Sequence, residues 1–276
     1  MARQSGTLAR VVPRLVATDL DGTLLRGDGT VSARTRAALE RAQALGVEIV
    51  LCTARPVRWM RDLAEAGGVA GIAVCANGAV LWDLAADELV GSFPIAPAAA
   101  LEVVGKLRRF VPGGSWAMET HDHFGHEPGY RVRWPVPEDA TVAAIEPLLA
   151  TPPVKLLLRP EEAGDAAAFA ERARAEVAEL VEVTYSDASA SLLEMSAAGV
   201  SKGSGLAAVC AARGIDRAQT VAFGDMPNDL PMLGFAGRSY AMAGGHPEVI
   251  AAADEVAPPN DEDGVAAVLE RLLDER

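Results

Sequence analysis

Short apolar runs alternate with amphipathic segments in the first and last thirds of the chain. Apolar runs of strand length, bounded by turn residues, are typical of buried strands. The early part predicts strands at 15–18, 47–52 and 71–75 and helices at 32–45 and 56–66. The late part predicts helices at 202–213, 228–235, 247–253 and 263–273 and strands at 220–223 and 239–242. Alternating strands and helices indicate a parallel sheet that is covered on both faces.

The middle of the chain has a different pattern. Helical stretches at 98–110, 138–149 and 161–178 alternate with strands at 154–159 and 180–185 that carry charge on one face. Charge on one face is typical of an antiparallel sheet that is open on one side. We therefore expect a second α+β module inserted into the first, which divides the chain into a core (1–83), an insert (84–192) and the rest of the core (193–276).

The composition says more about possible binding partners than about the fold. Of 276 residues 50% are apolar, and the formal net charge is −13. This balance disfavours nucleic acid and anionic membranes, which require clustered lysine and arginine. No apolar run is long enough for a signal peptide or a membrane span, so we expect a cytoplasmic protein. The three scattered cysteines are expected to be buried free thiols: Cys52, Cys75 and Cys210.

The first strand runs into two carboxylates that are two residues apart. Asp19 and Asp21 follow strand 15–18, and Gly22 and Thr23 permit a sharp turn after them. Like charges this close repel each other unless a cation or a shared proton compensates. The segment is consistent with a loop that holds a metal and an anion, and also with a solvated turn after an edge strand.

Polar residues also follow the other core strands. Thr53 and Arg55 follow strand 47–52, Lys202 opens a helix, and Asp225 follows strand 220–223. Ligands of parallel sheets bind at the carboxyl ends of the strands, so these segments are expected to meet. Their chemistry suits phosphoryl transfer, with carboxylates for Mg²⁺ and for nucleophilic attack, and a hydroxyl and an ammonium group for the phosphoryl oxygens.

These motifs resemble those of the haloacid dehalogenase-like (HAD) phosphohydrolase superfamily. The resemblance lies in the run DLDGTLL at 19–25, in Thr53, in Lys202 and in the run GDMPND at 224–229. Further segments resemble the Cof-type branch: Asn77-Gly78-Ala79, Leu193-Glu194-Met195, Gly199–Gly203, Ala241-Met242-Ala243 and Asp261–Val265. The resemblance implies an α/β fold, with a Rossmann-like parallel-sheet core and an inserted α+β cap of class IIB.

The resemblance also implies a role for each motif residue. It makes Asp19 the nucleophile and Asp21 the general acid and base, with the backbone carbonyl of Asp21 on the metal. Asp225 becomes a metal ligand, and Asp229 acts on the metal through its ligands or through water. The predicted metal group is thus Asp19, Asp21, Asp225 and Asp229. Thr53 and Lys202 would bind the phosphoryl group, with Asn228 close to it.

Several residues are open to more than one interpretation. Arg55 is either a substrate-binding residue or a surface residue at a helix start. The loop with His121, His123 and His126 fits a surface loop, a substrate contact shared with Glu119, Arg131 or Arg133, or, least well, a metal site. The tryptophans are expected to pack in the core, with Trp134 in the cap as a candidate for substrate contact.

The function predicted from these observations is that of a Mg²⁺-dependent phosphatase. It would hydrolyse a small phosphomonoester, such as a sugar phosphate or a phosphorylated cofactor, through an aspartyl-phosphate. The alternatives are a phosphomutase of the same superfamily and a phospho-ligand sensor without turnover. The expected partner is a small phosphorylated metabolite. The sequence identifies neither that metabolite nor the oligomeric state.

Overall fold

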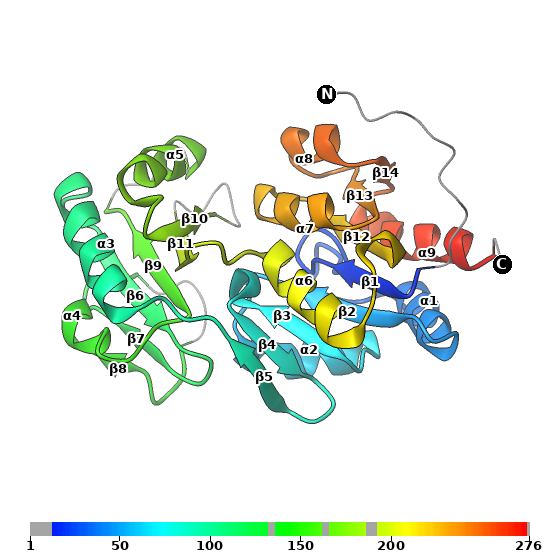
Figure 1. The fold of residues 1–276 in the computed structure, drawn as a ribbon, viewed down its shortest axis with the longest axis horizontal. Helices are drawn as coiled ribbons and strands as arrows, with labels where there is room; N and C mark the ends of the chain where they lie inside the picture. The colour runs from blue at the N-terminus through cyan, green and yellow to red at the C-terminus, as the bar shows by residue number, and fades with distance from the viewer. Residues whose placement is uncertain (1–12, 132–135, 162–165, 186–191, 275–276) are drawn as a thin grey trace.

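Two lobes lie side by side in the computed structural model, and the chain passes twice between them (Figure 1). The structure describes residues 13–131, 136–161, 166–185 and 192–274. The right-hand lobe in Figure 1 contains the first and last parts of the chain, and the left-hand lobe contains the middle. We call the former the core and the latter the cap.

The core is built on an eight-stranded sheet in the order β14-β13-β12-β1-β2-β3-β4-β5. The first six of these strands run parallel to one another, and β4 and β5 form an antiparallel hairpin beside β3. The strands are β1 (Leu15–Thr18), β2 (Glu48–Cys52), β3 (Ile72–Cys75), β4 (Val80–Asp83), β5 (Glu88–Ser92), β12 (Thr220–Gly224), β13 (Arg238–Met242) and β14 (Glu255–Ala257).

Helices cover both faces of this sheet, as the continuous apolar strands require. On one face, Val16 and Ile49 pack with α1, α2 and α9; on the other, Leu15 and Val50 pack with α6, α7 and α8. The helices are α1 (Ala33–Ala44), α2 (Met60–Gly67), α6 (Lys202–Arg213), α7 (Leu230–Phe235), α8 (Pro247–Ala252) and α9 (Gly264–Asp274). Ser32 caps α1 by accepting a hydrogen bond from the backbone N–H of Thr35.

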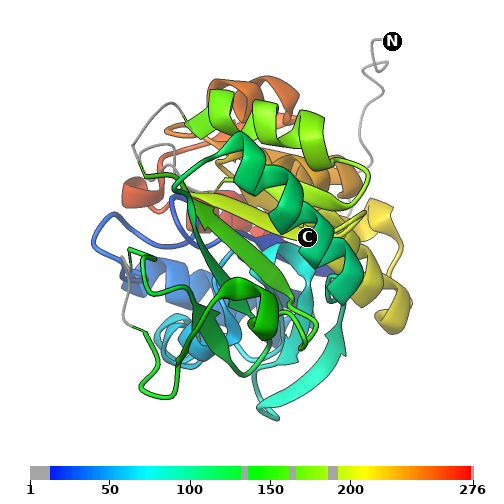
Figure 2. The same ribbon diagram turned by 90° about the vertical axis from the view of Figure 1, so that its left-hand side faces the viewer.

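The cap is built on a six-stranded sheet in the order β10-β11-β9-β6-β7-β8, antiparallel except for the β7–β8 pair. In the part of the cap that the structure describes, three helices accompany this sheet, and Figure 2 shows α3 and α5 on its outer side. The strands are β6 (Ser115–Glu119), β7 (Phe124–His126), β8 (Thr141–Val142), β9 (Lys155–Arg159), β10 (Val181–Thr184) and β11 (Leu193–Ala197), and the helices are α3 (Pro97–Phe110), α4 (Ile145–Leu148) and α5 (Ala166–Val177).

Side chains of the cap strands alternate between two environments, as the period of two along a strand requires. Trp116, Leu156 and Met195 pack against the helices. The opposite face carries Lys155 and Glu194, which are nevertheless buried at 3% and 5% exposure. This second face is covered where the cap meets the core.

The predicted fold class, a parallel α/β core with an α+β cap, is confirmed. The expected boundaries at 83/84 and 192/193 need correction, because β5 pairs with β4 in the core sheet and β11 pairs with β9 in the cap sheet. A hairpin thus extends the core past residue 83, and the cap continues to residue 197.

One predicted helix is wrong. In place of a helix at 138–149, the structure has β8 and the four-residue helix α4. Proline lacks an N–H and is tolerated only in the first turn of a helix, so Pro147 prevents a helix from running through this segment. Four residues of the helix predicted at 161–178 lie outside the described residues, and α5 occupies 166–177.

Two further expectations concern buried thiols and membrane spans. Cys52, Cys75 and Cys210 are buried free cysteines, as predicted. Among the helices that the structure describes, none combines the length and apolarity needed to cross a membrane.

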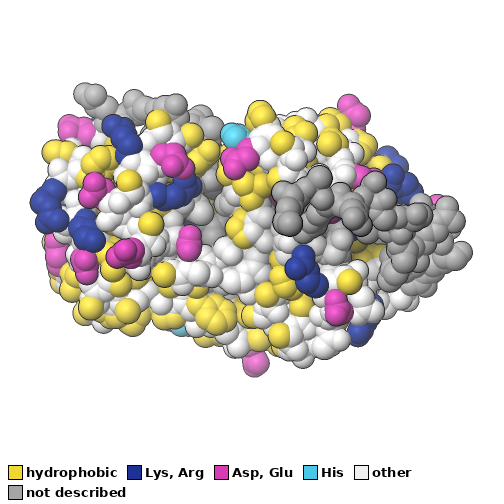
Figure 3. All heavy atoms as spheres, turned by 45° about the horizontal axis from the view of Figure 1, so that its top comes forward, with side chains coloured by type: hydrophobic (Ala, Val, Ile, Leu, Met, Phe, Trp, Pro, Cys, Tyr) yellow, Lys and Arg dark blue, Asp and Glu magenta, His cyan; other side chains and the backbone are white. Residues whose placement is uncertain are grey.

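On the face shown in Figure 3, acidic and basic side chains are interspersed with apolar ones.

Close packing between α6 and α7 depends on a glycine. A Cβ on Gly203 would lie 2.4 Å from the carbonyl oxygen of Pro231, whereas one on Gly105 in α3 would meet no atom within 4 Å. We expect Gly203→Ala to lower the free energy of unfolding by about 1–3 kcal/mol through overpacking. Gly105→Ala, the control, should raise it by about 0.5–1 kcal/mol because alanine favours helix. Urea denaturation measures both, and equal effects would contradict the packing argument.

Candidate active site

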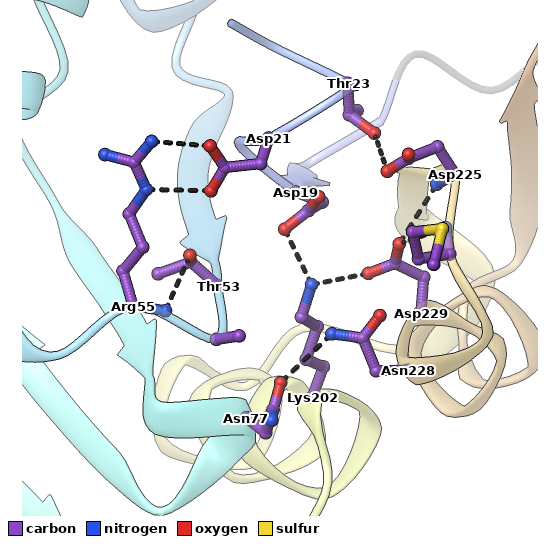
Figure 4. Close-up of polar contacts among 12 residues, drawn as sticks. Asp19, Asp21, Thr23, Thr53, Arg55, Asn77, Lys202, Asp225, Asn228 and Asp229 are labelled. Carbon is purple, nitrogen blue, oxygen red and sulfur yellow. Dashed lines mark hydrogen bonds and ion pairs between the residues drawn. The ribbon is translucent and has the colours of Figure 1, made fainter. Parts of the chain in front are cut away.

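The predicted motif residues meet where β1, β2 and β12 end (Figure 4). β1 lies between the other two strands, so residues that follow the three strands become neighbours. Asp19 follows β1 and donates its N–H to the carbonyl of Phe223 at 3.0 Å. Thr53 follows β2, and Asp225 follows β12. Parallel pairing of the strands therefore assembles the site.

Lys202 links two of these segments from the first residue of α6. Its Nζ donates to Oδ1 of Asp19 and to Oδ1 of Asp229, both at 2.6 Å, and the side chain is only 1% exposed. Burial alone would lower the pKa of Lys202, but the charges of Asp19 and Asp229 outweigh it, so the pKa lies above its ordinary value. Lys202 is therefore a buried cation between two carboxylates.

The carboxylate of Asp229 also closes the loop that follows β12. Its Oδ2 accepts the N–H groups of Asp225 and Met226, both at 3.0 Å. Gly224 makes room for this arrangement, since a Cβ there would lie 2.5 Å from the Cβ of Asp229. Asp229 therefore fixes the backbone that carries Asp225 while it binds Lys202.

Three carboxylates form a group that could hold a metal ion. One oxygen from each of Asp19, Asp225 and Asp229 lies within 4.8 Å of the others. Burial raises the pKa of Asp19 well above its ordinary value despite Lys202, and burial together with the charge of Asp229 raises the pKa of Asp225 to about 6. A divalent cation would relieve this repulsion, and carboxylate oxygens are the ligands that Mg²⁺ prefers. The residues thus fit the expected metal.

The turn after β1 brings Thr23 to this group. Thr23 Oγ1 donates to Oδ1 of Asp225 at 3.0 Å. Gly22 has a φ of +79°, and a Cβ on it would lie 2.4 Å from Oδ2 of Asp225. Only glycine combines this conformation with so close an approach to a carboxylate. Gly22 and Thr23 of the first motif therefore help to position the carboxylate of Asp225.

The Asp21 carboxylate lies apart from the three-carboxylate group. Asp21 is exposed, and Arg55 donates two hydrogen bonds to its carboxylate (Figure 4). The Nε of Arg55 lies 2.7 Å from Oδ2, and its Nη2 contacts Oδ1. The side chain of Asp21 is thus not part of the group that could hold a metal. The metal contact predicted for Asp21 involves its backbone carbonyl. The paired geometry is the one in which guanidinium and carboxylate bind most strongly.

Thr53 and Arg55 share a short polar loop. Thr53 is buried, and its Oγ1 accepts the backbone N–H of Arg55 at 3.0 Å. Because the oxygen is the acceptor, the hydroxyl hydrogen is left to donate to a ligand. Asn228, the remaining predicted residue, is buried and donates through Nδ2 to Oδ1 of Asn77 at 3.1 Å.

The structure adds residues to which the sequence assigned no role. Asn77, in the turn after β3, donates to Oε2 of Glu194 at 2.8 Å, and Lys155 donates to the same oxygen at 2.9 Å. Asn77 and Glu194 lie in segments that resemble the family, and the Asn-Gly pair at 77–78 signals a turn. Their contact joins positions more than a hundred residues apart, which no local pattern reports.

The cap histidines form no metal site with one another in the described structure. Nε2 of His123 lies 3.0 Å from Oγ1 of Thr141, and Nδ1 of His126 lies 2.8 Å from the carbonyl of Glu127. The candidate metal group found among the described residues contains aspartates alone. Glu119 binds Arg58 of the core at 2.8 Å. Arg133 and Trp134 lie outside the described residues.

A family model for haloacid dehalogenase-like hydrolases matches residues 16–269. The chain belongs to this family. It is 27% identical over 264 residues to the 5-amino-6-(5-phospho-D-ribitylamino)uracil phosphatase YcsE of Bacillus subtilis, covering 93% of this chain and 94% of that one. It is 27% identical over 265 residues to the pyridoxal phosphate phosphatase YbhA of Escherichia coli, covering 92% and 96%.

A solved structure supports the two-lobed architecture of this family member. The HAD subclass IIB sugar phosphatase BT4131 superposes with a TM-score of 0.75 at 20% identity, covering 94% of this chain and 98% of that one. At this identity the likeness concerns the fold. It places the parallel core and the mixed-sheet cap of this chain in the class IIB arrangement, as the resemblance implied.

Crowded carboxylates make the stability of the metal-free protein depend on pH. Because the pKa of Asp225 is about 6 in the folded protein and about 4 in the unfolded chain, its protonation stabilises the fold below pH 4, and this contribution is lost as the pH rises through 6. We expect the free energy of unfolding of Asp225→Asn, measured without metal, to rise by about 2 kcal/mol relative to that of the unaltered protein as the pH increases from 4 to 7. Urea titrations across this range measure the difference. A difference that does not vary with pH would contradict the assignment.

Proposed function

We propose that this chain hydrolyses a small phosphomonoester with Mg²⁺, through a phosphate ester formed on Asp19. The chain is a phosphatase of the haloacid dehalogenase-like family, in keeping with its family match and with the activities in the names of its relatives. The observation that carries the mechanism is the placement of Asp19, buried at a strand end between Lys202 and two further carboxylates.

The first half-reaction transfers the phosphoryl group to the protein. An oxygen of Asp19 attacks phosphorus, a P–O bond to the carboxylate forms, and the bond to the leaving alcohol breaks. Lys202 and the Thr53 hydroxyl bind the phosphoryl oxygens, where charge develops. The carboxylates of Asp19, Asp225 and Asp229 would hold Mg²⁺, which supplies charge stabilisation to phosphoryl transfer.

The second half-reaction returns Asp19 to its starting state. Water attacks phosphorus, Asp21 accepts the proton of that water, and the bond between phosphorus and Asp19 breaks with release of phosphate. In the first half-reaction, Asp21 gives a proton to the leaving alkoxide. Arg55 contacts both oxygens of the Asp21 carboxyl group and so orients the group that gives and takes these protons.

The cap is proposed to select the leaving group. Its inner face presents Lys155 to the carbonyl of Ala54, which lies between Thr53 and Arg55, and Glu119 to Arg58. A polar, charged face suits a hydroxylated or ionised leaving group, such as the alcohol of a sugar phosphate or of a phosphorylated cofactor. The names of the relatives above contain both a phosphorylated ribityl compound and a phosphorylated pyridine.

Two alternatives share the same site. A phosphomutase would return the phosphoryl group to a second hydroxyl of its substrate, and a sensor would bind without turnover. The motif residues for hydrolysis are all present and, apart from the exposed Asp21, lie together at the strand ends. Release of phosphate without a bisphosphate activator would separate hydrolysis from both alternatives.

Replacing the nucleophile is the decisive test. Asp19→Asn keeps the shape of the side chain but removes its nucleophilicity, and we expect it to abolish Mg²⁺-dependent release of phosphate. Phosphate is assayed from a panel of sugar phosphates and phosphorylated cofactors, with Mg²⁺ and with chelator. The best member of the panel identifies the leaving group. Full activity in the variant, or activity that the chelator does not reduce, would overturn the proposal.

The paired geometry on Asp21 gives a second test. We expect Arg55→Lys to lower kcat about tenfold, because an ammonium group cannot make both hydrogen bonds and so orients the acid–base carboxylate less well. The matched control is Arg58→Lys, since Arg58 contacts Glu119 through a single nitrogen that an ammonium can replace. Steady-state kinetics with the best panel substrate compares the two. An equal effect of both changes would argue against a special role for the pair.

A further inference from the structure

A buried ion pair lies on the inner face of the cap. Lys155 of β9 and Glu194 of β11 occupy adjacent strands, and Nζ of Lys155 donates to Oε2 of Glu194 at 2.9 Å. Both side chains are almost fully buried. A buried ion pair is weak evidence for stability, because burial of the charges offsets their attraction. The role of this ion pair is therefore sought in its contacts with the core.

Both members of this pair reach into the core. Lys155 Nζ also donates to the carbonyl of Ala54, in the loop between Thr53 and Arg55. Oε2 of Glu194 also accepts from Nδ2 of Asn77 at 2.8 Å. Asn77 lies in the turn after β3 with a φ of +57°, a left-handed conformation that asparagine tolerates better than most residues. The pair thus touches two core loops beside the active site.

Hydrogen-bond chemistry fixes the orientation of two amides in succession. A carboxylate can only accept, so Glu194 requires Asn77 to present its Nδ2. The Oδ1 of Asn77 then faces the other way and can only accept, so Asn228 must present its own Nδ2, which lies 3.1 Å from it. This leaves the Oδ1 of Asn228 buried, with no partner among the described residues.

The amide at the end of this chain of contacts lies in the catalytic loop. Asn228 directly precedes Asp229, whose carboxylate binds Lys202 and the backbone of Asp225. An unpartnered buried acceptor there suits a donor that arrives with the substrate, such as a hydroxyl group or a bound water. Rotation of this amide by half a turn would exchange that acceptor for an N–H group.

We propose that Glu194 is a positioning residue through which the seated cap orients the Asn228 amide. This proposal rests on the proposed function for its effect on turnover, but not for the orientation itself. With the cap seated, the negative charge of Glu194 selects one orientation of Asn77 and hence of Asn228. Without that charge, each amide has two orientations of similar energy, and the active site is less well organised.

The test removes the relay without straining the turn. Asn77→Gly deletes the intermediate side chain and suits the positive φ of this position. Glu194→Met is the second variant, because methionine keeps the approximate length of the side chain but removes the carboxylate acceptor, whereas a glutamine oxygen would be held in place by Lys155 Nζ and would still accept from Asn77. We expect each change to lower kcat for p-nitrophenyl phosphate with Mg²⁺ about tenfold, with KM within about twofold, as found when a supporting partner of a catalytic group is lost.

A matched control lies on β10, the other neighbour of β11. Thr184 of β10 accepts a weaker hydrogen bond from Asn77 Nδ2, at 3.2 Å, and its removal leaves the contact with Glu194 in place. Thr184→Val should therefore leave kcat within about twofold of the unaltered protein. A tenfold loss in this control as well would show that the region is merely sensitive to change, which would overturn the proposal.

Nuclear magnetic resonance of the side-chain NH₂ groups reads the orientation without turnover. We expect the Asn228 signals to shift and lose protection from hydrogen exchange in Asn77→Gly and Glu194→Met, but not in Thr184→Val. Unchanged Asn228 signals in the first two variants would overturn the proposal. If the unaltered protein does not hydrolyse the ester, the proposed function is in doubt, while the amide signals still decide whether the relay exists.

Discussion

The buried contact of Lys202 with Asp19 and Asp229 is the interaction on which the rest of the site depends. The segments after two strands and the start of one helix each bring a residue to it, and none of the three charges could be buried alone. Removal of the ammonium would leave two carboxylates, next to a third, without a counter-charge. The parallel sheet supplies the meeting point, and Lys202 makes the crowding of acids there tolerable.

This arrangement explains why the motif residues could be predicted and their roles only in part. Three of the motifs follow a buried strand closely, and strands of this kind have a strong local pattern, so Asp19, Thr53 and Asp225 could be placed from the sequence. Their neighbours in space follow from the rule that ligands bind at the carboxyl ends of parallel strands. The bidentate contact of Arg55 with Asp21 could not be foreseen, because it depends on the course of two loops.

The features that the sequence does not predict correctly depend on contacts or positions that the local pattern of residues does not report. The hairpin of β4 and β5 has an exposed outer strand with a weak pattern, so the sequence predicts an end of the core that comes too early. At 138–149 the apolar spacing resembled a helix, but Pro147 and the pairing of Thr141 with Gly125 of β7 decided otherwise. The contact of Asn77 with Glu194 is non-local, and only the assembled fold brings its partners together.

Two aspartates two residues apart are thus placed in opposite environments by two different cations. Asp19 is buried against an ammonium group that it shares with Asp229, whereas Asp21 is exposed and held by a guanidinium group. A compact ammonium suits a carboxylate that must also approach a metal and a phosphoryl group, because it occupies one oxygen. A guanidinium engages both oxygens and fixes the plane of a carboxylate, which suits proton transfer. The chemistry of the two aspartates is therefore divided by their partners, and a lysine and an arginine at these positions would not be interchangeable.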